Sequence, residues 1–242
     1  MKHIFFLMAF CVCCLKGLAQ SGTITHHFYM TKNDATVDTC KLSMYITNGK
    51  VNNVVFAINH KSINTYIIGF ITGDPNMYHE YKSIETRIND FRNMLISLKE
   101  KYVQWTATAK ANNVTDFEKK IGNFENIPIF SIEAIIEGAR YYQKSEIPYI
   151  CSCSPYFYVN KNGVYGLFFG WKSKTTERTI GYNQGFWTSY PIKEEKETGD
   201  IIFRFTSVSQ FDSLIDALDV EKTKKMLNDN AESKKDIDSL FK

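Results

Sequence analysis

Apolar and polar residues alternate along residues 40–47, and this period of two predicts a β-strand with one buried face. Asn48-Gly49 follows directly and is the dipeptide that most strongly favours a tight β-hairpin. Residues 51–58 are therefore predicted to return as the second strand. Residues 63–72 are apolar on both faces, which predicts a central strand. The apolar positions of the first strand are Cys40, Leu42, Met44 and Ile46.

Helical spacing replaces the alternation over residues 78–102. Asp74 is a candidate N-cap, and Pro75 suits a first helical turn. The face opposite the apolar stripe carries charges of both signs, so we expect an amphipathic helix with one face in the core. Residues 101–110 are predicted either as a short strand or as a fraying helix end. The apolar stripe consists of Ile84, Ile88, Phe91, Leu95, Leu98 and Tyr102.

Further elements are predicted in the second half of the chain. Ser131 is a candidate N-cap for another helix, and a second hairpin is expected over residues 156–171. A strand at 201–205 precedes Ser207 and Gln210, which have the spacing of a capping box. The helix after Ser131 would place Ile132, Ile135, Ile136 and Ala139 on one side, and the helix after Ser207 would bury Phe211, Leu214, Ile215 and Leu218.

These elements predict an α+β fold with antiparallel sheet and two or three packed helices, in a single globular domain over residues 20–228. Hairpin, strand and helix follow one another twice, over residues 40–102 and 156–218. Two interpretations stay open, an internal duplication and an independent arrival at a common layout. Apolar residues thin out towards the end, so residues 229–242 are predicted as a polar C-terminal tail.

The first residues have the order of a secretory signal peptide. Lys2 gives a basic start, residues 4–15 are unbroken apolar, and Gly17-Leu18-Ala19 supplies small residues before Gln20. Residues 1–19 are therefore predicted to direct export to the periplasm, the cell surface or the exterior. No later apolar run approaches the roughly eighteen residues of a membrane-spanning helix, so no transmembrane segment is expected in the mature chain.

Part of the sequence carries a family resemblance. The stretches concerned are Leu18-Ala19-Gln20, KYVQWTATAKANNVTDFEKKIG at 101–122 and FRFTSVSQFDSLIDALD at 203–219. They resemble secreted proteins of unassigned function from Bacteroidetes. The resemblance implies export in a Gram-negative cell, and it transfers no catalytic or binding residue.

The charge balance bears on partners. Loss of the leader would remove Lys2 and Lys16 and lower the formal net charge from +3 to +1. A near-neutral surface of mixed sign gives no electrostatic basis for binding nucleic acid, so no nucleic-acid partner is expected.

Three of the six cysteines lie beyond the leader, namely Cys40, Cys151 and Cys153. A disulfide between Cys151 and Cys153 would be strained, because residues two apart in a strand have Cα atoms about 6.5 Å apart. A disulfide from Cys40 to one of them is easier to form, and export to an oxidising compartment favours it. Reduced, packed cysteines are the alternative, and labelling the thiols without reductant distinguishes the two.

Metal and catalytic motifs are weak. His79-Glu80 begins like a zinc-protease helix, but Ser83 stands where the second histidine would be needed. His26 and His27 are adjacent and would point to opposite faces of a strand. No nucleophile elbow, P-loop or dinucleotide fingerprint occurs. No metal site and no cofactor are therefore expected, and an enzyme would need catalytic residues dispersed along the chain.

The candidate ligand-binding stretch is TIGYNQGFWTSYP, residues 179–191. Aromatic residues beside amides offer flat apolar faces for a sugar ring and hydrogen-bonding groups for its hydroxyls. The same composition also fits a strand-loop-strand whose aromatic side chains pack inwards. The candidate contact residues are Tyr182, Phe186, Trp187 and Tyr190.

The expected function is an exported, non-catalytic binding or structural module of the cell envelope, with a glycan or an envelope protein as candidate partner. A glycan-acting enzyme and a subunit of an envelope assembly are the alternatives. An exposed aromatic patch near residues 182–190 would favour binding, whereas a cleft with two carboxylates would favour glycan hydrolysis.

Overall fold

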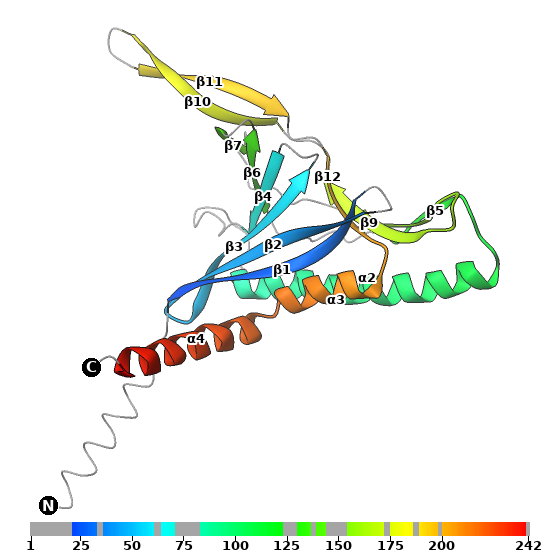
Figure 1. Cartoon of the computed structure of the whole chain (residues 1–242). Coiled ribbons are helices and arrows are strands. Elements are labelled where there is room, and N and C mark those ends of the chain that lie inside the picture. Colours follow the sequence, from blue (N-terminus) through cyan, green and yellow to red (C-terminus); the bar gives the residue numbers. More distant parts are fainter. Residues whose placement is uncertain are drawn as a thin grey trace, which may run out of the picture.

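The computed structural model describes residues 21–32, 36–60, 64–70, 83–122, 130–136, 139–143, 154–171, 175–185, 189–197 and 200–240. Over these residues the chain combines two antiparallel sheets with three helices, which confirms the α+β fold (Figure 1). Helices α2 and α3 lie together against the large sheet, and α4 packs on β1 with its first turns and then extends beyond the sheet.

Within the described residues, the large sheet has eight strands and the small sheet has four. In spatial order, the large sheet comprises β1 (Gly22–Lys32), β2 (Thr36–Thr47), β3 (Lys50–His60), β4 (Asn64–Phe70), β6 (Phe130–Ile136), β7 (Ala139–Gln143), β10 (Thr175–Gln184) and β11 (Ser189–Glu197). The small sheet comprises β12 (Ile201–Phe205), β9 (Tyr165–Trp171), β8 (Tyr156–Val159) and β5 (Phe117–Lys120). The helices are α2 (Ile84–Ala111), α3 (Val208–Ala217) and α4 (Val220–Leu240).

The first predicted hairpin is confirmed as β2 and β3. The predicted apolar positions of β2, from Cys40 to Ile46, are all buried, and the residues between them are exposed or half-buried. Asn48 and Gly49 both have positive φ angles, 52° and 72°, as a two-residue hairpin turn requires. Strand β1 pairs along the whole of β2 and extends the sheet by one strand.

Helix α2 is longer at its C-terminal end than the sequence predicted. Within the described residues it starts after Ser83, whose hydroxyl accepts a hydrogen bond from the Thr86 N–H at 3.1 Å. The whole predicted apolar stripe is buried. Residues 101–110 continue the helix, so they are neither a strand nor a fraying end. The predicted cap at Asp74 lies outside the described residues.

The prediction of a helix after Ser131 is wrong. Residues 130–136 form β6, which pairs with β4 from Phe70↔Phe130 to Thr65↔Ile135, and residues 139–143 return as β7. Three isoleucines fit a helical spacing, but β-branched residues also favour strands. The pairing with β4, about sixty residues earlier, decides the conformation.

Helices α3 and α4 cover the β1 edge of the large sheet. The Ser213 hydroxyl on α3 accepts a hydrogen bond from the Tyr29 N–H at 3.1 Å. On α4, Leu227 lies against Gly22 of β1. A Cβ atom added to Gly22 would come within 2.7 Å of the Leu227 Cδ1 atom. An uncovered edge strand can pair with other chains, so these contacts protect the sheet. The structure describes α4 as helical to Leu240, where the sequence predicted a polar tail.

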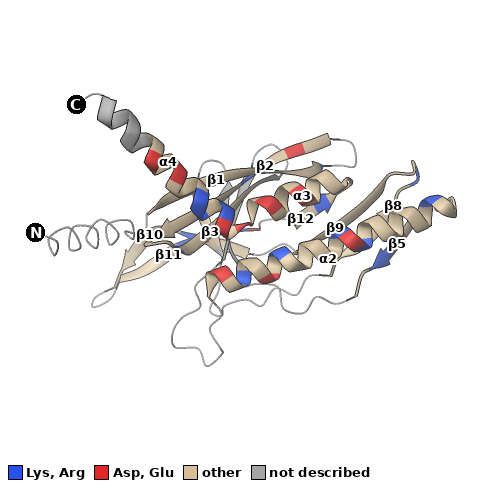
Figure 2. Cartoon of the chain, turned by 90° about the horizontal axis from the view of Figure 1, so that it is seen from below, with Lys and Arg blue, Asp and Glu red and all other residues tan. Residues whose placement is uncertain are grey.

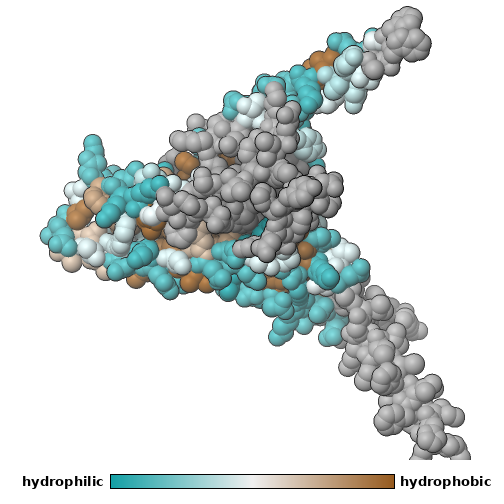
Figure 3. Space-filling model, turned by 180° about the vertical axis from the view of Figure 1, so that it is seen from behind, coloured by the Kyte–Doolittle hydropathy of each residue, from teal (hydrophilic) through white to brown (hydrophobic). Residues whose placement is uncertain are grey.

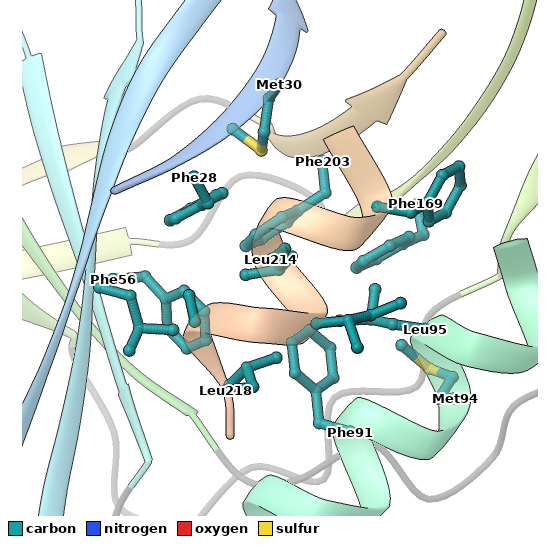
Figure 4. Packing of buried hydrophobic residues seen from close by; sticks show 14 of the residues in the cluster. Phe28, Met30, Phe56, Phe91, Met94, Leu95, Phe169, Phe203, Leu214 and Leu218 are labelled. Carbon is teal, nitrogen blue, oxygen red and sulfur yellow. The ribbon is translucent and has the colours of Figure 1, made fainter. Parts of the chain in front are cut away.

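Aromatic side chains from both sheets and from α2 meet in one core (Figure 4). Phe203 of β12 stacks on Phe28 of β1 and on Phe169 of β9, with ring centroids 6.4 and 5.2 Å apart. It also makes edge contacts with Phe56 of β3 and Phe91 of α2. The two sheets therefore share a single hydrophobic core.

His26 links β1 to α4, and we expect it to make the stability of the fold sensitive to acid. Its Nε2 atom lies 2.8 Å from the Thr223 hydroxyl. Burial lowers the pKa of His26, the nearby Lys222 charge lowers it further, and Asp216 opposes them in part. In the unfolded chain the pKa of His26 is therefore higher than in the folded chain, close to its ordinary value of about 6.5. The stability that neutral His26 provides should be complete above that pH and be lost as the pH falls below it.

We expect His26→Gln to flatten the dependence of the unfolding midpoint on pH between about 7.5 and 5, because this variant has no imidazole to protonate. Thermal unfolding at a series of pH values measures this dependence. The exposed neighbour gives the matched control, and His27→Gln should keep the wild-type profile. Parallel profiles for wild type and His26→Gln would contradict the assignment.

Candidate functional site

The stretch predicted to bind ligand lies on a two-stranded ribbon formed by β10 and β11. Figure 1 shows this ribbon projecting from the end of the large sheet, beyond β7. Only Thr176 and Glu177 of β10 pair with β7, so the rest of the ribbon has no other strand beside it in the part of the chain that the structure describes. Both predicted residues that are described, Tyr182 and Tyr190, are exposed, by 64% and 62%. Phe186 and Trp187 lie outside the described residues.

The strand register places the two tyrosines on opposite faces of the ribbon. Tyr182 is opposite Pro191, and Tyr190 is opposite Asn183. Directly opposed residues share a face and consecutive residues alternate between faces, so Tyr182 and Tyr190 point away from each other. The inward packing that the composition also allowed does not occur at these two positions. The two rings also cannot form one flat platform for a single sugar.

Charged residues gather at the base of the ribbon, where it joins the sheet. Arg178 donates to Glu194 through its Nε atom at 2.8 Å, and the Tyr141 hydroxyl donates to the same carboxylate at 3.0 Å. These hydrogen bonds, the one from Arg178 first, lower the pKa of Glu194. Lys193 pairs with Glu177 on the other face. Glu194 is therefore held in an ion pair on β11.

Sequence reasoning missed a second candidate site on the outer face of the small sheet. A hollow of about 280 Å³ opens there, just below the usual range for ligand pockets. Its lining residues come from β5, β8, β9 and β12 and the adjoining turns. They are Asp116, Phe117, Glu118, Tyr158, Val159, Asn160, Phe168 and Arg204.

An arginine stacked on aromatic rings forms part of this hollow. The Arg204 guanidinium carbon lies 5.6 Å from the Tyr158 ring centroid and 5.9 Å from that of Phe168. Tyr156 stacks on Phe168 with centroids 5.5 Å apart. Gly166 leaves room for Tyr158, because an added Cβ would come within 2.3 Å of that ring. Such stacking fixes a guanidinium as a directed hydrogen-bond donor.

Polar groups around the hollow differ in their availability. The Asn160 side-chain oxygen accepts hydrogen bonds from the Asn162 and Val164 N–H groups, both at 2.9 Å, so it closes the β8–β9 turn. Asp116 and Glu118 are exposed carboxylates two residues apart. With Arg204 they give the lining a formal charge of −1, which suits neutral polar ligands better than anions.

The sequence-predicted cysteines and histidines do not form a described site. Cys40 is buried on the core face of β2, while Cys151 and Cys153 lie outside the described residues, so the disulfide stays a prediction. His26 is half-buried and His27 exposed on β1, on opposite faces as expected. Among the residues that the structure places, no group of three or more His, Cys, Asp and Glu side chains could hold a metal ion.

Charge and hydropathy vary over short distances on the described surface. Figure 2 shows Lys and Arg interspersed with Asp and Glu along α2 and α4, whereas the charged residues of α3 are both Asp. Figure 3 shows a largely hydrophilic surface with separate hydrophobic spots, one of them on the projecting ribbon. Within the described ranges, no helix is long and apolar enough to cross a bilayer.

Comparison with known proteins gives no relative. No family model matches the chain, and neither a curated protein nor a solved structure matches it.

Proposed function

We propose that this chain is an exported, non-catalytic binding module of the cell envelope, and that the ribbon formed by β10 and β11 is its contact surface. One observation carries the proposal. Tyr182 and Tyr190 are largely exposed on a ribbon that projects from the protein body. Exposed tyrosines are enriched at binding surfaces, because each offers a large apolar ring and a polar hydroxyl.

A second candidate function, action on a glycan, is favoured by the hollow on the small sheet. It brings Asp116 and Glu118 to one place, and glycoside hydrolysis uses two carboxylates. Both side chains are exposed, whereas a general acid depends on burial or neighbouring charge to hold its proton. The hollow is therefore proposed first as a binding site for a sugar residue and only then as a hydrolytic site.

One experiment separates the two surfaces. The purified protein is screened against glycans and envelope extracts beside a ribbon variant, Tyr182→Ser with Tyr190→Ser, and a hollow variant, Asp116→Asn with Glu118→Gln. We expect the ribbon variant to lose at least about tenfold in affinity for envelope extract and the hollow variant to lose about as much for the glycan. Circular dichroism and unfolding midpoints confirm that both variants are folded.

The outcomes are distinct. Unchanged binding of extract by the ribbon variant would refute the ribbon as contact surface. Unchanged glycan binding by the hollow variant would refute the hollow. Release of reducing sugar by wild type, abolished in the hollow variant, would establish an enzyme.

Export and internal duplication are further proposals. Cell fractionation with N-terminal sequencing tests export, since a cytoplasmic chain that retains Met1 would refute it. The duplication is supported by the order β2-β3-β4-α2, which β8-β9-β12-α3 repeats with β10 and β11 inserted. Superposition of residues 40–102 on 156–218 tests it, and helices on opposite sides of their strands would refute it.

A further inference from the structure

The outer half of the ribbon carries no charged residue. Between Arg178 and Lys193, residues 179–192 contain no Asp, Glu, Lys, Arg or His. We call the described residues of this stretch, 179–185 and 189–192, the distal ribbon. The ion pairs described above lie at its base, so charge ends where the ribbon leaves the sheet.

Apolar side chains of the distal ribbon are exposed on both faces. Besides the two tyrosines, Ile180 is exposed by 56% and Ile192 by 39%. Ile192 is opposite Gly181 and shares a face with Tyr190, while Tyr182 lies on the other face with Pro191. A flat protein surface could cover only one of these faces. A partner that covers both faces has to surround the ribbon.

The backbone limits how apolar that partner can be. Beyond Glu177, β10 pairs only with β11 in the described structure, so each strand of the distal ribbon has an outer edge of unpaired N–H and C=O groups. In hydrocarbon such unpaired groups are strongly unfavourable, because no water satisfies them. The headgroup zone of a bilayer supplies water and phosphate oxygens at those edges and apolar contact to the side chains. Tyrosine is enriched in this zone.

We propose that the distal ribbon inserts into the headgroup zone of a lipid bilayer and anchors the protein peripherally. This inference rests on the ribbon being the contact surface. The charge distribution supports this proposal, because the uncharged distal ribbon can enter the headgroup zone without desolvating an ion. The base pairs its cations with carboxylates, at Arg178–Glu194, Lys193–Glu177 and Lys196–Glu194, which matches zwitterionic headgroups rather than an anionic surface.

Vesicle co-sedimentation tests the proposal on the purified protein. Phosphatidylcholine vesicles are compared with the same vesicles containing added phosphatidylglycerol, each at low and at high salt. We expect similar binding to both and little loss in salt, because apolar contact drives it. Tyr182→Ser with Tyr190→Ser should lower the partition coefficient at least about tenfold.

A matched control excludes a general effect of losing two tyrosines. Tyr29 and Tyr45 are exposed by 43% and 42% on other strands of the same sheet. Tyr29→Ser with Tyr45→Ser should bind vesicles as wild type does. An equal loss in both double variants would overturn the proposal, as would binding only to anionic vesicles or its disappearance in salt.

The lipid inference and the proposed function fail separately. If wild type binds neither vesicle while the ribbon variant still loses affinity for delipidated envelope extract, the lipid inference falls and the contact surface stands. If the ribbon variant keeps full affinity for both vesicles and extract, both fall.

Discussion

Phe203→Ala is expected to lower the free energy of unfolding by about 3–5 kcal/mol, because it empties the centre of a fully buried aromatic cluster. Among the described residues, the Phe203 ring contacts those of Phe28, Phe56, Phe91 and Phe169. These rings come from β1, β3, α2 and β9, so a cavity at this point weakens both sheets and the helix together. Chemical denaturation followed by circular dichroism measures the loss.

The matched control is Phe117→Ala on β5, because Phe117 is 42% exposed. A substitution at such a surface position should cost less than about 1 kcal/mol. If the two variants lose similar stability, or if the small sheet unfolds in a separate transition from the large one, the single shared core is refuted.

The aromatic cluster around Phe203 also shows which part of the fold could be predicted from the sequence. Phe203 was predicted on a strand and Phe91 on the buried stripe of a helix, and both are buried. Local periodicity identifies the face that a residue buries, since it depends only on neighbours along the chain. That these two faces meet depends on contacts more than a hundred residues apart, which periodicity does not contain.

Residues 130–136 mark the limit of that reasoning. Isoleucines at 132, 135 and 136 satisfy a helical stripe, yet Phe130, Ile132, Ala134 and Ile136 also satisfy a period of two. The two patterns overlap in so short a segment. Pairing with β4 favours the strand over the helix, and the sequence of residues 130–136 does not indicate that pairing partner.

The two candidate sites could be predicted from the sequence to different degrees. The aromatic, uncharged composition around Tyr182 and Tyr190 was visible in the sequence. Their placement on opposite faces follows from the β10–β11 register, which composition does not give. The hollow joins Glu118, Phe168 and Arg204 from strands far apart along the chain. The available signal was the outward-facing aromatic residues of the second hairpin, among them Tyr156 and Phe168.

Gln210→Ala is expected to lower the free energy of unfolding by about 2–3 kcal/mol, although Gln210 is a polar residue. Its side-chain oxygen accepts hydrogen bonds from the Thr206 N–H at 2.7 Å and the Ser207 N–H at 3.2 Å. Its amide nitrogen donates to the Thr31 hydroxyl at 2.9 Å, and both Gln210 and Thr31 are buried. Alanine would leave these donors and the hydroxyl without this partner, and unsatisfied buried groups cost about 1–3 kcal/mol each.

An exposed glutamine provides the comparison. Gln104→Ala on α2 removes a surface side chain of the same type and should change stability by less than about 0.5 kcal/mol. Equal losses in the two variants would mean that the effect is one of helix propensity and not of the buried network.

A double-mutant cycle with Thr31→Val then tests whether the network joins two distant elements. Gln210 lies in the first turn of α3 and Thr31 near the end of β1, and their side chains form a hydrogen bond across 179 residues of chain. Because both single variants break the same contact, their costs should be non-additive by about 0.5–3 kcal/mol. Additive costs would show that the contact between Gln210 and Thr31 does not couple α3 to β1. Non-additive costs would show that the predicted capping box also fixes where α3 docks, because its amide bonds a strand as well as its own helix.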